Sequence, residues 1–429
     1  MSNIFVYDEF GPEDVAMMQA LYSRSPKSVT EHVEKVKASG SGKFMETFYV
    51  GYGHASIADC GSTTIFIEDI SIIGDKAIQD WQLYSGQETS TRYIDMSTRA
   101  IIDPLNTPES KSIIEGWMSF YINNQEKIQQ YLITKYPRKD GEDENVYLKA
   151  IKARGFDIMR GFLPAGITTQ LSWHTNLRQA WDHLALLRHH PLAEVRETAE
   201  TILEKLKEKY SHSFSHATYD EQENYRDEMV KKYSYFSSKS PVEFSMNTTI
   251  KSEELKKYQE LLDKRPIKTG LPNFLGDLGT FTFDFLLDFG SFRDLQRHRN
   301  GICRMPLLTT DLGFSSWYLE QLPDDLRAEA LELITAQKEK LNNLKTTPEI
   351  KQYYIAMGFN VSCLVTYPLP AAVYVIELRS NRTVHPSLRT IAHKMHHAVL
   401  NLFPNLKLYS DLDLDDWDVR RGLADITNK

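Results

Sequence analysis

The sequence predicts a mixed α+β protein in which helices predominate. Long segments repeat apolar residues at helical spacing, and two short segments have the β-branched and aromatic composition of strands. The two kinds of segment do not alternate as they would in a βαβ series. With 429 residues, of which 41% are hydrophobic and 25% charged, the chain is long enough for two or three globular domains and is not a disordered chain.

The expected elements follow from local pattern. The first strand is expected over 63–67 because threonine and isoleucine surround a phenylalanine there, and the second over 281–285 because three phenylalanines alternate with polar residues. Apolar periodicity predicts four long helices, and the third follows Pro323-Asp324-Asp325, which suits a helix start. These helices are expected over 113–132, 192–206, 324–341 and 387–402.

The two sides of the chain share an order of features. A polar segment over 211–241 is the expected linker. On each side of it a phenylalanine-containing strand precedes a helix that carries Gln79 or Gln296, and a Leu-Arg pair, a His-Pro pair and an amphipathic helix come later. We therefore predict an ancient tandem duplication, with domains 1–235 and 236–429. The alternative is two unrelated helical domains with coincidental dipeptides.

Composition excludes several classes of protein. The net charge of −8 argues against a nucleic-acid partner. The three cysteines form no CxxC pair, which argues against a zinc ribbon and a disulfide scaffold. No leader pattern and no membrane-length apolar run is present, so a cytoplasmic protein without a membrane partner is expected. His393, His396 and His397 share a helix without a carboxylate or cysteine at metal spacing, so surface histidines and no metal are expected.

One polar segment, 84–93, has the residue types of a phosphate-binding loop. Glu88, Ser90 and Arg92 project a carboxylate, a hydroxyl and a guanidinium at alternate positions, and an arginine fork with nearby hydroxyl donors suits a phosphate monoester. The alternative is a capped surface turn in which Arg92 pairs with Glu88.

A second segment, Gln296-Arg297-His298-Arg299-Asn300, concentrates positive charge on one turn. Phosphates or an anionic ring would satisfy its two guanidinium groups. The alternative is a solvated basic patch.

Several further pieces of the first half, taken with these two segments, resemble the flavin-dependent thymidylate synthases. The family carries an Arg-His-Arg triplet followed by a longer Ser-x-Asn-Glu-x-Ser-x-Arg-Tyr pattern. Over about residues 20–205 the matching pieces lie in the family's order, with Gln87 in place of the family's asparagine. The pieces are Gly53-His54, Thr64-Ile65-Phe66, Ser85–Tyr93, Arg160-Gly161-Phe162-Leu163-Pro164, Asn176-Leu177-Arg178 and Leu187-Arg188.

The departures from the family pattern are complementary between the halves. The first half has Asp80-Trp81-Gln82 where the family has Arg-His-Arg, and Cys60 where it has a second histidine. The second half, which resembles the family more weakly over about 265–402, keeps Arg297-His298-Arg299 but has Leu307 in place of the serine. One half therefore keeps the nucleotide loop, and the other keeps the triplet.

The resemblance implies a fold of two tandem domains, each a small, mostly antiparallel sheet with a helical subdomain. It implies reductive methylation of dUMP to dTMP with methylenetetrahydrofolate, FAD and NADPH. Family members are homotetramers with shared active sites, so two fused chains are expected to form a homodimer that rebuilds a pseudo-tetramer with composite sites. The alternatives are a diverged enzyme that binds flavin and nucleotide but runs another one-carbon or redox reaction, and a non-catalytic nucleotide-binding relic.

The resemblance also implies roles for single residues, carried over position by position. Arg188 would stabilise charge on the uracil, and Ser90 would lie beside the nucleotide as the other catalytic residue. The residues implied for substrate binding are Gln87, Glu88, Ser90, Arg92, Arg160, Arg188 and Arg379. The residues implied for FAD binding are His54, Asn176, Arg178, Arg297, His298 and Arg299.

Overall fold

The computed structural model describes residues 9–23, 25 and 27–413. The chain separates into two compact units that interleave along the sequence. The first unit contains Met1–Ile70, Ala77–Glu88 and Gln170–Ser234, and the second contains Ser71–Lys76, Thr89–Thr169 and Tyr235–Lys429. The predicted domains 1–235 and 236–429 rest on sequence repetition and stay a prediction. The N-terminal stretch, where no leader is expected, lies largely outside the described residues.

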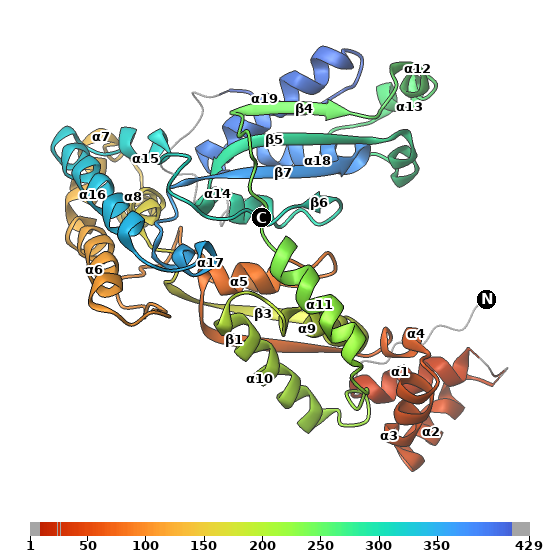
Figure 1. The fold of residues 1–429 in the computed structure, drawn as a ribbon. Coiled ribbons are helices and arrows are strands. Elements are labelled where there is room, and N and C mark those ends of the chain that lie inside the picture. The colour runs from red at the N-terminus through yellow and green to blue at the C-terminus, as the bar shows by residue number, and fades with distance from the viewer. Residues whose placement is uncertain (1–8, 24, 26, 414–429) are drawn as a thin grey trace. The chain divides into compact units, whose positions relative to one another are not determined.

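The first unit combines a helical N-terminal part with a three-stranded sheet of order β1-β3-β2 (Figure 1). Ser28 and Asn176 cap α2 and α9 by accepting hydrogen bonds from backbone amides. The elements before the sheet are α1 (Pro12–Tyr22), α2 (Val29–Ser39), α3 (Gly42–Phe44), η1 (Met45–Gly51) and α4 (Ala55–Ala58). The strands are β1 (Ser62–Ser71), β2 (Ser85–Glu88) and β3 (Thr168–Asn176), and the helices after them are α9 (Leu177–Leu187), α10 (Ala193–Lys209) and α11 (Asp220–Tyr233).

The second unit contains a four-stranded sheet of order β4-β5-β7-β6, and α18 and α19 pack against it (Figure 1). Its central strands pair antiparallel from Thr280 opposite Pro368 to Asp288 opposite Asn360. The strands are β4 (Phe244–Thr248), β5 (Thr280–Asp288), β6 (Ile302–Cys303) and β7 (Asn360–Pro368). The surrounding elements are α12 (Ser252–Lys256), α13 (Gln259–Lys264), η3 (Asn273–Leu278), α14 (Phe289–Leu295), α18 (Leu369–Arg379) and α19 (Pro386–Leu402).

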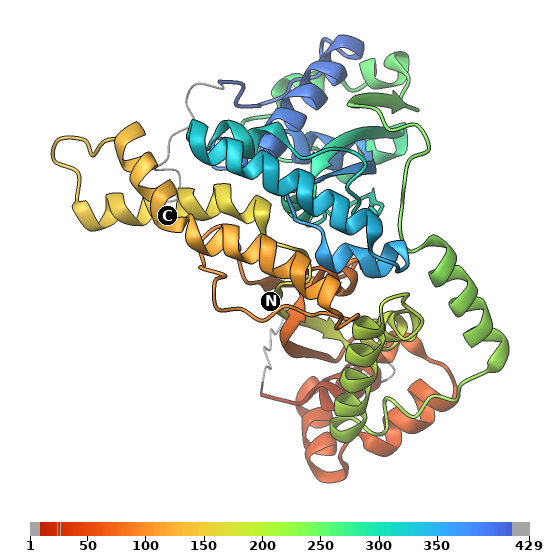
Figure 2. The same cartoon turned by 60° about the vertical axis from the view of Figure 1, so that its left-hand side comes forward.

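A helical layer in the second unit brings α6 and α16 alongside each other (Figures 1 and 2). Gln337, fully buried on α16, donates to the backbone oxygen of Ile113 on α6 at 2.8 Å. The layer consists of α6 (Pro108–Asn123), α7 (Gln125–Lys135), α8 (Glu144–Met159), η2 (Arg160–Phe162), α15 (Ser316–Glu320), α16 (Asp324–Asn343), α17 (Pro348–Lys351) and η4 (Gln352–Tyr354).

The predicted fold class and the approximate positions of the elements are confirmed. Both predicted strands are present and are longer than expected, and three of the four predicted helices match α10, α16 and α19. The single helix expected over 113–132 is wrong, because Asn124 adopts a non-helical backbone and divides it into α6 and α7. The expected linker 211–241 contains α11, a helix without a buried residue.

The two halves repeat one backbone register, which is consistent with the predicted duplication. In the first half the amides of Ile72 and Ile73 donate to the oxygens of Ile167 and Ala165. In the second half the amides of Phe289 and Gly290 donate to those of Phe359 and Met357. The residue before each helix accepts from an amide three positions on, Ser71 from Gly74 and Asp288 from Ser291.

The shared register fixes which residues correspond. Ser85 of β2 lies opposite His174 of β3, and Ile302 of β6 lies opposite Thr366 of β7. Strands β2 and β6 therefore begin at corresponding positions in the two halves. By this register Gln79 corresponds to Gln296, and Asp80-Trp81-Gln82 corresponds to Arg297-His298-Arg299. Arg188 corresponds to Ser380, whereas Arg379 corresponds to Leu187.

Within the second unit the matching segments of the two halves pair with each other. The amide of Ala165 donates to the oxygen of Ile355, and the amide of Met357 donates reciprocally to that of Leu163. A second reciprocal set joins Gly166 to Tyr353 and Gly358 to Gly161. The pairing has the isologous form of a two-fold interface, here built inside one chain.

Part of α5 (Ile72–Gln79) belongs to each unit. In the described part of the chain no helix has the length and apolarity needed to cross a bilayer.

Candidate functional site

The Arg-His-Arg turn directly follows α14 in the second unit. Asp288 caps this helix, and Gln296 ends it with a buried side chain whose Nε2 donates to the backbone oxygen of Lys76 at 3.0 Å. Arg297 is exposed and His298 is buried. Arg299, which is partly exposed, donates from Nη1 to the oxygen of Arg297 at 3.3 Å. The turn therefore presents the guanidinium group of Arg297 outward, whereas Nε of Arg299 and the ring of His298 are buried.

Asp294 contacts three arginines, two through its carboxylate and one through its backbone oxygen. Its Oδ2 lies 4.0 Å from Nη1 of Arg92, and its Oδ1 lies 3.9 Å from Nε of Arg297. Its backbone oxygen accepts from Nη2 of Arg379 at 2.6 Å. Burial raises the pKa of Asp294, but Arg92 and Arg379 outweigh it and lower the value from 3.8 to about 2. The carboxylate therefore stays ionised.

His298 is held in its neutral form. Its Nε2 accepts from Nε of Arg379 at 2.6 Å, which requires an unprotonated nitrogen. Burial, and then the charge of Arg379, lower the pKa of His298 to about 3. Its ring also meets Tyr374 edge-on at a centroid distance of 6.0 Å. His298 thus positions Arg379 and has no titration near neutral pH.

Arg92 is neutralised by a buried carboxylate. Its Nε donates to Oδ1 of Asp157 at 2.8 Å, and its Nη2 donates to the oxygen of Thr383 at 3.4 Å. Its own amide donates to Oγ of Ser90, which fixes the loop. The alternative pairing of Arg92 with Glu88 does not occur, since Glu88 accepts from Gln79 at 2.6 Å.

Arg160 lies fully inside the second unit, next to the same group of charges. Its Nη2 donates to Oγ of Ser291 at 3.1 Å, and Tyr318 donates to the buried Asp288 at 2.7 Å. Burial opposes the charge of Arg160, but Tyr318 and the surrounding carboxylates, Asp157 foremost, raise its pKa. Arg160 is therefore a structural charge in this arrangement.

In the first unit two predicted site arginines already have carboxylate partners. Arg178 pairs with both oxygens of Asp59 at 2.7 Å, with about one third of each side chain exposed. Arg188 lies at the C-terminal end of α9, 15% exposed, and donates to Glu223 of α11 at 2.8 Å. Either guanidinium would have to exchange a carboxylate to reach an anionic ligand.

The remaining predicted residues of the first unit have mixed environments. Asn176 caps α9, with its Oδ1 accepting from the amide of Gln179 at 2.8 Å. His54 is exposed and lies against Phe48, at a centroid distance of 6.4 Å. Gln87 is exposed on β2. His54 and Gln87 thus face solvent, whereas Asn176 has a helix-capping role.

Sequence reasoning missed the carboxylates that organise the site. Asp294 lies three positions before Arg297, the spacing at which helical side chains meet, and this spacing was a usable signal. Asp157 gives no such signal, because it lies 65 positions from Arg92.

Two of the three histidines of α19 are not surface residues, contrary to expectation, whereas His397 is exposed as expected. His393 and His396 are buried, and they hydrogen-bond to the oxygen of Asp411 at 2.8 Å and to the hydroxyl of Ser410 at 2.9 Å. They therefore hold the segment that follows α19. The residues that the structure describes contain no cluster of three potential metal ligands.

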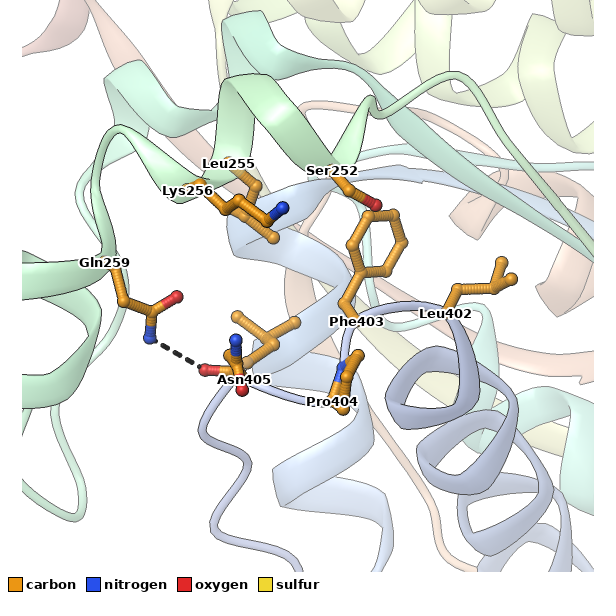
Figure 3. Close-up of a pocket in the computed structure, with 9 residues that line it drawn as sticks. Ser252, Leu255, Lys256, Gln259, Leu402, Phe403, Pro404 and Asn405 are labelled. Carbon is orange, nitrogen blue, oxygen red and sulfur yellow. Dashed lines mark hydrogen bonds between the residues drawn. The ribbon is translucent and has the colours of Figure 1, made fainter.

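A small cavity of about 250 Å³ lies between α12 and the end of α19 (Figure 3). Leu255, Lys256, Leu402 and Phe403 are among its lining residues, and Gln259 donates to the oxygen of Asn405 at its rim. None of the predicted site residues lines it, so it is not part of the candidate site.

Comparison with known proteins shows what the chain is similar to. Residues 6–210 match the family described as thymidylate synthase complementing protein. The match spans somewhat less than half of the chain, so it shows that this part of the chain is similar to that family.

Relatives that match most of the chain include UPF0159 proteins. One, from Chlamydia pneumoniae, is 24% identical over 86% of this chain and 82% of its own length. Another, Ta1429 from Thermoplasma acidophilum, is 23% identical over 96% of this chain and 98% of its own length. The relatives extend well beyond residue 210, so the family match covers only part of what they share with this chain.

Proposed function

We propose that the chain is a flavin-dependent enzyme related to thymidylate synthase. In this proposal the chain itself methylates dUMP to dTMP at composite sites, with methylenetetrahydrofolate and NADPH as co-substrates. The observation that supports this is the meeting of Arg92, Arg297 and Arg379 around Asp294. Arg92 comes from the nucleotide-loop motif of the first half, whereas Arg297 and Arg379 come from the second half. Because each half has lost a motif that the other half keeps, the residues gathered around Asp294 would be the site that remains.

The residues present fit an anionic cofactor such as FAD at the Arg-His-Arg turn. Arg297 has 42% of its side chain exposed, and its contact with Asp294 is long, at 3.9 Å. Arg297 and Arg299 would hold the diphosphate, whereas His298 is occupied by Arg379. Bound FAD would supply the hydride chemistry of the methylation.

The chain's own residues would bind the nucleotide. Arg92 would receive the phosphate, with the hydroxyl of Ser90 as a further donor. Asp294 would keep three guanidinium groups together before substrate arrives, because like charges would otherwise separate. A homodimer would supply two such sites.

A second candidate function is favoured by the ion pairs of the nucleotide arginines. Asp157 already neutralises Arg92, and Glu223 already neutralises Arg188. A diverged enzyme that binds flavin and a nucleotide but performs another one-carbon or redox reaction would be consistent with this.

A flavin titration separates the two candidates. Purified protein is mixed with excess FAD, reduced without oxygen, and then given dUMP while the visible spectrum is recorded. Bound flavin that responds to dUMP supports the synthase, and bound flavin that ignores dUMP supports the diverged enzyme. Absence of bound flavin at any concentration would overturn both.

Matched variants locate the flavin. Arg297→Ala is expected to weaken FAD binding about tenfold, the loss of one charge-assisted contact of about 1.4 kcal/mol. Its control is Asp80→Ala, at the corresponding position of the first half, which should leave FAD binding unchanged. Growth of a thymidine auxotroph on the wild-type gene then tests the methylation itself.

A further inference from the structure

A cavity of about 470 Å³ in the second unit is lined by none of the predicted site residues, although Tyr374, which lines it, meets the ring of His298. The loop 265–270, the outer face of α18 and the segment around Tyr409 form its walls. The volume falls in the range of cavities that hold small ligands, roughly 300–1,000 Å³.

The cavity exposes apolar side chains that a folded protein normally buries. Ile267 is 63% exposed, Tyr374 53% and Leu378 41%, and all three line it. Exposed aromatic and branched side chains gathered around one hollow indicate a surface that binds a flat apolar ring.

The charges of the cavity leave one lysine uncompensated. Arg265 pairs with both oxygens of Glu377, at 2.5 and 3.1 Å, and Asp411 pairs with Arg389 at 3.2 Å. Lys268 has no ion-pair partner among the residues that the structure describes. A ligand that neutralises the charge of Lys268 would therefore carry an anionic group.

Lys268 also has an unusual backbone. Its φ of +62° lies in the left-handed region, which side chains with a Cβ adopt at an energetic cost. Strained residues beside a binding cavity are typical of ligand sites. A polar donor lies nearby, because Oδ1 of Asn381 accepts both bonds from Thr383 and leaves the amide nitrogen as a donor.

In the first half, the chain that follows α10 contacts the corresponding helix, α9. Trp181 of α9 corresponds to Val373 of α18 in the shared register, and it stacks on His216 at a centroid distance of 4.4 Å. That face of α9 is thus covered by the chain that follows α10.

We infer that this cavity is a second nucleotide site, which takes a nucleoside monophosphate with its base on Tyr374 and its phosphate at Lys268. This assignment does not depend on the proposed methylation. Asn381 would donate to the edge of the base, and Ile267 and Leu378 would cover its faces.

Calorimetric titration of the full chain tests the inference with AMP, UMP and adenosine as probes. AMP or UMP is expected to bind saturably at one site per chain, and AMP about tenfold more tightly than adenosine, which lacks the phosphate. In Lys268→Gly this advantage of AMP should disappear, and in Tyr374→Ala all three probes should lose measurable binding. Binding of only AMP or only UMP would support the site and identify the base class.

Two controls keep the outcome decisive. Lys264→Ala removes an exposed lysine outside the cavity that pairs with Glu260, and it should bind like the wild type. Arg297→Ala should also leave AMP binding unchanged. Absence of binding by both nucleotides, unchanged binding in Lys268→Gly, or loss of binding in Arg297→Ala would overturn the inference. Thermal unfolding of each variant verifies that it is folded.

Discussion

The turn after α5 and the turn after α14 have the same backbone register and opposite chemistry. In the first half Trp81 stacks on His183 at 4.6 Å and donates to Gln179 at 3.0 Å. In the second half the corresponding His298 accepts from Arg379, beside Arg297 and the carboxylate of Asp294. Strand pairing and helix capping thus maintain the frame, while the residues on the turn are free to change from charged to aromatic.

Where the charges are buried, the structure depends on their pairing. Asp157 has no exposed side-chain surface, whereas Asp59 of the first unit is about one third exposed, although each holds a predicted site arginine. Breaking a buried pair costs far more than breaking an exposed one, because the remaining charge has no water to solvate it.

The largest expected effect comes from Asp157→Asn. It leaves Arg92 and the fully buried Arg154 without their shared carboxylate, so the free energy of unfolding should fall by about 3–5 kcal/mol. Urea denaturation measures this change. Asp59→Asn, the matched control, should cost at most about 1 kcal/mol. Equal losses in the two variants would contradict the contrast between buried and exposed pairs.

The next effect concerns acid stability. The pKa of Asp294 is depressed from 3.8 to about 2, so its contribution is present above pH 4 and is lost as the pH falls toward 2. Over this window the wild type should lose about 2 kcal/mol more than Asp294→Asn. Denaturation curves at several pH values give the difference between the two proteins. Parallel pH profiles would show that the arginines do not stabilise this carboxylate.

A smaller effect distinguishes two corresponding strand positions. A Cβ at Gly86 would lie 1.8 Å from the oxygen of Ser172, whereas the corresponding residue of β6, Cys303, already carries a side chain. Gly86→Ala should therefore cost about 1–2 kcal/mol, and Cys303→Ala well below about 1 kcal/mol. Thermal unfolding of both variants compares them. A cost in Cys303→Ala as large as that in Gly86→Ala would refute this steric account.

The smallest expected effect is an increase in stability. Lys268→Gly relieves the positive φ of the cavity loop and should raise the free energy of unfolding by about 0.5–1 kcal/mol. Thermal unfolding of this variant measures the gain, with Lys264→Ala as the reference. A loss of stability would mean that the lysine side chain makes stabilising contacts in the loop.

The fold was largely predictable because its signals are local. Apolar periodicity located α10, α16 and α19, and alternation located β5. The division at Asn124 was not predicted, because the apolar face continues across it into α7. The register of the duplication was predictable at Gln79 and Gln296, since both glutamines occupy the same distance from a recognisable strand.

Only the positively charged residues of the candidate site could be predicted from the sequence. Arginines within a motif can be recognised from the sequence. The carboxylate that pairs with Arg92 cannot, because it lies far away in the sequence, on α8. The pairing of Arg188 with Glu223 had the same origin, because α11 falls within the segment that was expected to be a linker. Tertiary contacts of this kind leave no trace in local spacing.

The reciprocal pairing of the two halves has a consequence for synthesis on the ribosome. The backbone groups of 161–166 pair with 353–358, which are made roughly 190 residues later. At about 5–20 residues per second this delay lasts on the order of 10–40 seconds. During that time the first half exposes an unpaired edge whose natural complement resembles itself. Neighbouring nascent chains on one messenger would be competing partners, so pauses or chaperone contacts before residue 353 would favour pairing within the chain.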